Sequence, residues 1–136
     1  MRTHPTRLSD AGITPWRYAE LRAICRQYRE CRRALDRARA GIVDAPGHRS
    51  GAWRRPDPTG NAAIRLAAMR EQRVVKAVEQ SAAAVAEPAV AEAILRYVAD
   101  GVPYDRMRKP PPCGRNQFYV LILLFFIDLD ARLDWT

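Results

Sequence analysis

Residues 93–119 read AILRYVADGVPYDRMRKPPPCGRNQFY, and this stretch decides how the chain is expected to fold. Its first part has the apolar spacing of a helix, which Gly101 is well placed to end. The segment 102–109 has room for one short helical turn, because the prolines at 110–112 prevent a helix from continuing. A new helix can begin near Gly114. The stretch therefore predicts two helices joined by a short helical turn and a tight break.

The flanking segments extend this pattern. Pro88 can begin the helix that Gly101 ends, and the last helix is expected to run from about 114 to 133. Its body, residues 118–127, carries no charge but is only about half as long as a membrane-spanning helix. We therefore expect a buried or interface helix and no membrane span. No segment alternates apolar and polar residues for long, so strands are not expected.

Two long helices are predicted upstream of residue 88. The first spans about 14–41, with Thr14 as its N-terminal cap. The second spans about 57–87, with Asp57 as its cap and a proline in its first turn. Residues 43–58 between them are rich in proline and glycine and predict a loop. The simplest arrangement is an antiparallel hairpin of two helices.

The helix at 14–41 has two distinct faces. Its apolar residues recur at alternating steps of four and three, which is typical of a helical hairpin or a short coiled coil. This heptad seam consists of Ile24, Tyr28, Cys31, Leu35, Ala38 and Ile42. The opposite side, here called the arginine face, consists of Arg22, Arg26, Arg29, Arg33 and Arg37. The arginine face is either a solvated surface or a stripe that contacts phosphates, and both interpretations stay open.

Together these elements predict an all-α protein. Residues 1–87 would form an N-terminal domain, the helical hairpin, whose helices cover about 14–87. Residues 88–136 would form a small C-terminal domain that resembles a helix-turn-helix. The homo-oligomer that we expect would form through the apolar last helix or through the heptad seam.

The chain is strongly basic. It carries 23 Lys and Arg against 15 Asp and Glu, and only Lys76 and Lys109 among the basic residues are not arginine. Arginine favours an anionic partner, because its planar guanidinium binds phosphate through two parallel hydrogen bonds. A coding bias that replaces lysine with arginine would give the same composition. Both explanations stay open.

Motifs of catalysis are missing from the sequence. No Gly-rich phosphate loop, HExxH, GxSxG or metal-type cysteine spacing occurs, so we expect no enzyme, no catalytic residue, no cofactor and no metal site. Asp128, Asp130 and Asp134 could bind a metal but are interpreted as a solvated tail. Three cysteines, an odd number, and a polar N-terminal segment favour a reducing, cytoplasmic location.

The start of the last helix carries residue types that can read DNA bases. Arginine pairs with guanine, and asparagine or glutamine pairs with adenine, when a helix N-terminus enters the major groove of double-stranded DNA. We expect the groove-facing residues to be Arg115, Asn116, Gln117 and Tyr119. The expected phosphate-binding residues are Arg106, Arg108 and Lys109.

The same span resembles the C-terminal domain of phage transcriptional activators of the RinA and ArpU type, whose helix-turn-helix is similar to sigma-factor region four. The resemblance is carried by Arg96-Tyr97, Gly101, Tyr104, Met107, Arg115 and Tyr119, which fall in matching register without a gap. The upstream outline, long helices flanking a loop that ends Asp-Pro-Thr-Gly, is also similar. The resemblance implies a phage or prophage transcriptional regulator that binds DNA.

Two features depart from the pattern of that family. The prolines at 110–112 truncate the supporting helix, and Gly114 stands where a serine cap is expected. The segment 120–127 is uncharged where the family usually carries basic residues. Two other functions therefore remain open. One is a phage packaging component similar to a small terminase subunit, and the other is a helical interaction module without nucleic-acid binding.

Overall fold

The computed structural model describes the backbone of residues 7–44 and 58–133 and the side chains of residues 7–38 and 69–133. Every regular element in these residues is a helix, so the all-α prediction is confirmed. The long helices are α1 (Pro15–Arg26), α2 (Tyr28–Asp44), α3 (Pro58–Val85), α4 (Pro88–Asp100) and α5 (Arg115–Arg132). The described residues also include the short 3-10 helices η1 (Leu8–Ala11) and η4 (Tyr104–Arg106). No described helix has the length and apolarity to span a bilayer. Residues 45–57 of the predicted loop, with the cap Asp57, lie outside the described residues.

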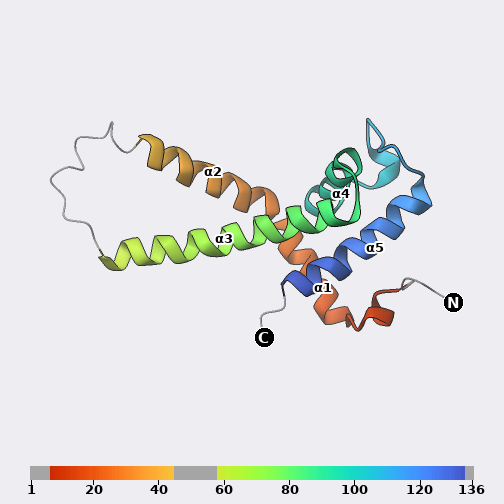
Figure 1. Cartoon of the computed structure of the whole chain (residues 1–136), viewed down its shortest axis with the longest axis horizontal. Coiled ribbons are helices and arrows are strands. Elements are labelled where there is room, and N and C mark those ends of the chain that lie inside the picture. Colours follow the sequence, from red (N-terminus) through yellow and green to blue (C-terminus); the bar gives the residue numbers. More distant parts are fainter. Residues whose placement is uncertain (1–6, 45–57, 134–136) are drawn as a thin grey trace.

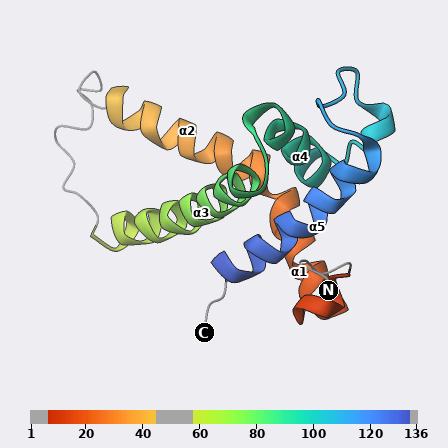
Figure 2. The same cartoon turned by 45° about the vertical axis from the view of Figure 1, so that its right-hand side comes forward.

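The long helix α3 organises the molecule. Its first half lies beside α2, which runs back along it as an antiparallel hairpin, and its second half meets α4 and α5 (Figure 1). The turned view in Figure 2 shows the same arrangement, with α1 crossing close to the C-terminal part of α5. The α4–α5 part and the hairpin therefore share α3 as a common support.

The prediction of one continuous helix over about 14–41 is wrong, because the chain bends at Gln27 and forms two helices, α1 and α2. The N–H of Gln27 bonds to the carbonyl of Ile24 at 3.1 Å, the tighter spacing of a final helical turn, and a new helix begins at Tyr28. The bend separates two buried faces. Leu21 and Cys25 are fully buried in the core on α1, whereas Tyr28 of α2 reaches Glu79 of α3. Contacts with different partners thus override a heptad seam that is continuous in the sequence.

Helix ends follow the expected local chemistry. The hydroxyl of Thr14 accepts a hydrogen bond from the N–H of Arg17 at 3.1 Å and caps α1, as predicted. Pro88 begins α4, and Gly101 ends it in the left-handed conformation at φ +74°. The N–H of Gly101 bonds to the carbonyl of Tyr97, and that of Val102 bonds to Arg96. This fixes the direction in which the chain leaves α4.

A single hydrophobic core runs through the described helices. Its fully buried side chains include Leu21 of α1, Val78 of α3, Ile94 of α4 and Phe125 of α5. The core therefore crosses residue 87, where the sequence predicts a domain boundary. Ser81, buried to the same degree, donates a hydrogen bond from α3 to Asp128 of α5 at 2.9 Å.

Candidate nucleic-acid interface

The connection between α4 and α5 is held by its own aromatic residues. The hydroxyl of Tyr104 donates to the carbonyl of Cys113 at 2.8 Å, which closes the connection on itself. Met107 of the same connection is buried. The rings of Tyr104 and Phe118 lie 5.6 Å apart, and Phe118 is fully buried at the first turn of α5. These contacts fix where α5 begins.

The N-terminus of α5 presents open backbone donors. Gly114 has no side chain to cap the helix. The first hydrogen bond of the helix runs from the N–H of Phe118 to the carbonyl oxygen of Gly114, at 2.9 Å. The N–H groups of Arg115, Asn116 and Gln117 precede that bond and have no acceptor within α5. Such a helix end carries a partial positive charge and attracts anions.

The side chains of this first turn also point to solvent. Arg115, Asn116 and Gln117 are exposed, while the next residue, Phe118, is buried. Nε of Arg115 lies 3.2 Å from a carboxylate oxygen of Asp105, but both side chains are mostly exposed. An exposed ion pair of this kind contributes about 0–1 kcal/mol, so a phosphate or a base can displace it at little cost.

Tyr119, which the sequence predicts to face the groove, is held in place by contacts with its neighbours. It is half-buried, its hydroxyl accepts a hydrogen bond from the N–H of Tyr104 at 3.4 Å, and its ring meets that of Tyr97 edge-on at 5.6 Å. The guanidinium of Arg115 lies over the Tyr119 ring, 5.4 Å from its centroid. Tyr119 therefore positions Arg115 and has limited reach of its own.

The predicted phosphate-binding residues lie beside this turn. Arg106, Arg108 and Lys109 are all exposed, and none of them forms an ion pair with another described residue. Asp105 is the one acidic residue in the segment 101–118, against four basic ones. The surface at the start of α5 is therefore positively charged.

The arginine face divides into parts with different partners. Arg29 binds Asp100 of α4, and this hydrogen bond raises the pKa of the Arg29 guanidinium. Arg22 lies over the ring of Tyr18, 5.5 Å from its centroid. Arg33 and Arg37 are exposed on α2. Arg33 and Arg37 thus have the exposure that both interpretations require, whereas Arg29 is held in an ion pair with Asp100.

The acidic residues near the C-terminus hold helices together. Asp130 accepts a hydrogen bond from Arg17 of α1 at 2.6 Å, and Asp128 binds Ser81 and Arg132. The solvated-tail interpretation is therefore wrong for these two residues, and Asp134 lies outside the described residues. No cluster of metal-ligating side chains is present in the part of the chain that the structure describes.

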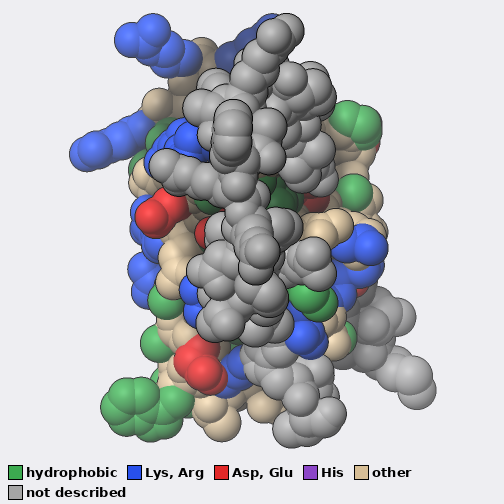
Figure 3. Space-filling view, turned by 90° about the vertical axis from the view of Figure 1, so that its left-hand side faces the viewer, with side chains coloured by type: hydrophobic (Ala, Val, Ile, Leu, Met, Phe, Trp, Pro, Cys, Tyr) green, Lys and Arg blue, Asp and Glu red, His purple; other side chains and the backbone are tan. Residues whose placement is uncertain are grey.

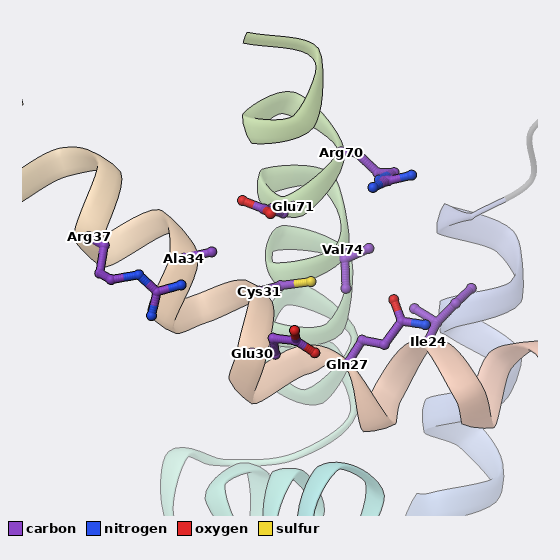
Figure 4. Close-up of a pocket in the computed structure, with 9 residues that line it drawn as sticks. All are labelled: Ile24, Gln27, Glu30, Cys31, Ala34, Arg37, Arg70, Glu71 and Val74. Carbon is purple, nitrogen blue, oxygen red and sulfur yellow. The ribbon is translucent and has the colours of Figure 1, made fainter. Parts of the chain in front are cut away.

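A hollow of about 430 Å³ lies between α2 and α3, at the bend near Gln27. Figure 4 labels its lining residues as Ile24, Gln27, Glu30, Cys31, Ala34, Arg37, Arg70, Glu71 and Val74. Two arginines and two glutamates balance each other there, so the hollow has no preference for anions. Burial raises the pKa of the Cys31 thiol, which keeps it protonated and weakly nucleophilic.

Seen from the hairpin end, basic side chains are spread around the described surface with acidic ones among them (Figure 3).

Part of α5 remains uncovered by the described residues. The side chain of Val120 is 40% exposed, and Leu121, Leu124 and Ile127 are half-buried. The opposite side of the helix, with Phe118, Phe125 and Leu129, is buried completely. The uncharged segment that departs from the family pattern is thus a core helix with one accessible apolar edge.

Comparison of the chain with known protein families, with curated proteins and with solved structures finds no match. In the part of the chain that the structure describes, the protein is all-helical and presents an uncapped, basic helix N-terminus to solvent.

Proposed function

We propose that the protein binds double-stranded DNA and that the first turn of α5 enters the major groove. The observation that carries this proposal is the exposure of Arg115, Asn116 and Gln117 together at an uncapped helix N-terminus. These side chains can make two-pronged contacts with guanine and adenine. The open N–H groups at the same helix end suit a backbone phosphate.

The phosphate contacts come from the connection before α5. Arg106, Arg108 and Lys109 are exposed on this connection. They lie next to the first turn of α5, residues 115–117, which we call the reading turn. Contacts of this type orient a protein on the duplex without reading its sequence. Asp105 limits the positive charge of the turn, and Tyr119 holds the guanidinium of Arg115 over its ring.

Within DNA-binding proteins, we infer a phage-type transcriptional regulator of the RinA and ArpU kind. The support is the register of Arg96-Tyr97, Gly101, Tyr104, Met107, Arg115 and Tyr119 along α4, η4 and α5. Such a regulator acts in the cytoplasm and reads a DNA site as an oligomer. The apolar edge of α5 around Val120 is the surface that we assign to self-association.

The test is binding of the purified chain to random duplex DNA at low and raised salt, with its mass in solution measured alongside. We expect binding that weakens steeply with salt, because counterions are released from each contacted phosphate. Replacing Arg108 and Lys109 with alanine should lower the slope of log affinity against log salt by about 1 for each lost phosphate contact. The variant Arg33→Ala/Arg37→Ala removes the same charge from α2 and should leave the slope unchanged. A folded sample without binding at low salt would refute the proposal.

The interaction module remains the second candidate, because the apolar edge of α5 is exposed whether or not DNA binds. In that case Val120→Asp should abolish self-association while removal of Arg108 and Lys109 changes nothing. A closed ring of subunits in solution would instead favour the terminase-like packaging role.

A further inference from the structure

A second, smaller pocket lies at the junction of α1, α4 and α5. It has a volume of about 190 Å³ and opens between Arg22 and Arg26 of α1, Tyr97 of α4 and Gly101. The two arginines are one helical turn apart and therefore project on the same side of α1. The pocket belongs neither to the predicted reading residues nor to the hollow between α2 and α3.

The charges of the two arginines are not neutralised by other described residues. Neither Arg22 nor Arg26 forms an ion pair within the described part of the chain, and both are exposed. The carboxylate nearest to this end of α4 is that of Asp100, and Arg29 binds both of its oxygens. The pocket therefore keeps two unpaired positive charges.

Gly101 creates the space for one of these charges. A side chain at this position would collide with Nη1 of Arg26, so the guanidinium lies directly against the end of α4. The negative end of the α4 dipole favours a cation at this position. The guanidinium of Arg26 thus lies at the edge of the pocket, next to the last turn of α4.

The wall of the pocket supplies a hydrogen-bond donor. Tyr97 lines the pocket together with Arg22 and Arg26. Burial raises the pKa of its phenol, and the positive charges of Arg22 and Arg26 act against that rise. The phenol remains protonated at neutral pH. Tyr97 also contacts Tyr119 edge-on, and Tyr119 supports Arg115. A continuous row of aromatic rings therefore connects the pocket to the reading turn.

We propose that this pocket binds a phosphate group through the guanidinium groups of Arg22 and Arg26 and the hydroxyl of Tyr97. For the source of the phosphate, the proposal rests on DNA binding and assigns a backbone phosphate beside the groove that α5 enters. Phe126 lines the pocket eleven residues after Arg115, a separation of about 16 Å along α5. The major groove is about 12 Å wide, so a strand that borders it lies within reach of the α1 arginines.

The first arm of the test uses duplex DNA. The variant Arg22→Gln/Arg26→Gln should bind DNA about tenfold more weakly at low salt, the effect of losing about 1.4 kcal/mol. Its salt slope should fall by about 0.9, the value for one phosphate. The matched control Arg33→Gln/Arg37→Gln removes two charges from the same arginine face and should match the unmodified chain. Tyr97→Phe removes only a hydroxyl and provides a variant that retains the packing.

The second arm uses inorganic phosphate. Titration at constant ionic strength, with chloride as the reference anion, should shift the NMR signals of the Arg26 side chain and of the Gly101 amide in the unmodified chain. In the Arg22→Gln/Arg26→Gln variant the Gly101 amide, the signal that both proteins share, should not shift. Phosphate-specific shifts without any DNA binding would support the pocket as a phosphate site and refute the DNA function.

A different result would refute the phosphate-binding pocket but not the proposed DNA binding. DNA binding with the same salt slope in Arg22→Gln/Arg26→Gln as in Arg33→Gln/Arg37→Gln, without phosphate-specific shifts, would overturn the pocket and leave the reading turn of α5 intact. Thermal unfolding of each variant establishes that the comparison is made between folded proteins.

Discussion

The guanidinium of Arg29 binds both carboxylate oxygens of Asp100, with N–O distances of 3.0 to 3.3 Å. Arg29 lies at the start of α2 and Asp100 is the last residue of α4, so the pair ties the base of the hairpin to the end of a helix 71 positions away in the chain. A cation at a helix C-terminus is favoured by the helix dipole as well as by the carboxylate. The same pair prevents Asp100 from neutralising Arg26.

We expect this ion pair to contribute modestly to stability. A double-mutant cycle of Arg29→Ala and Asp100→Ala should give a coupling of about 1 kcal/mol or less in urea unfolding, because both side chains are more than one-third exposed. The coupling should shrink in 1 M salt. A coupling above about 2 kcal/mol would mean that the pair is far more desolvated than the structure indicates.

Adjacent residues at the start of α5 should separate stability from DNA binding. Phe118→Ala should lower the free energy of unfolding by about 3–5 kcal/mol, because the ring is fully buried against Tyr97 and Tyr104. Gln117→Ala should change stability by about 0.5 kcal/mol at most, since its side chain is exposed. Chemical denaturation measures both changes. Equal losses would show that α5 begins in a different register.

Arg115 should control sequence preference more than affinity. We expect Arg115→Ala to relax selection at one base pair by about 1–3 kcal/mol, the discrimination of a two-pronged arginine–guanine contact. Selection of preferred sites from a random duplex library, before and after the substitution, measures this effect. An unchanged set of selected sites would place the reading residues elsewhere on the chain.

Stability should decline in alkaline solution. Burial raises the pKa of the Cys25 thiol from 9.0 to about 12, and burial together with the hydrogen bond to Glu79 raises the pKa of Tyr28 from 10.0 to about 12. The folded chain therefore holds these protons more tightly than the unfolded chain. Their contribution is fully present below pH 9 and is lost as the pH rises toward 12.

Urea unfolding at half-unit steps from pH 8 to pH 11 measures this decline. Tyr28→Phe removes one of the two titrating groups and should flatten the profile above pH 10. It should also cost about 1 kcal/mol at neutral pH, because the hydrogen bond to Glu79 is lost. A profile that stays level up to pH 11 in the unmodified chain would contradict the buried positions of both groups.

Local signals in the sequence predict most of the helices. Thr14, Pro88 and Gly101 mark helix ends through chemistry that acts within a few residues, and all three ends lie where these signals place them. The bend at Gln27 has no such signal. It arises because the helices on the two sides of the bend have different partners: α1 packs mainly against α4 and α5, and α2 packs against α3. Only the tertiary structure determines those partners.

The candidate site is predictable in part for the same reason. The exposure of Arg115, Asn116 and Gln117 follows from their position at a helix start, which the sequence reveals. The partners of Arg22 and Arg26 do not follow, because Tyr97 and Gly101 lie more than 70 positions further along the chain. The spacing of the arginines in the sequence predicts that they share one face of a helix. It does not predict which other helix that face contacts.

The shared core has a consequence for how such a chain can change. Because Leu21 and Val78 enclose the same core as Ile94 and Phe125, the segment that carries the reading turn is not a self-contained cassette. The hydrogen bond from the buried Ser81 to Asp128 also ties α5 to α3 and constrains the rotation of α5 about its axis, on which the direction of Arg115 depends. Replacing the C-terminal segment with one from another protein would change the direction of the first turn of α5, unless α1 and α3 were replaced as well. For the proposed DNA binding, substitutions at 115–117 are therefore a more accessible route to a new sequence preference than recombination.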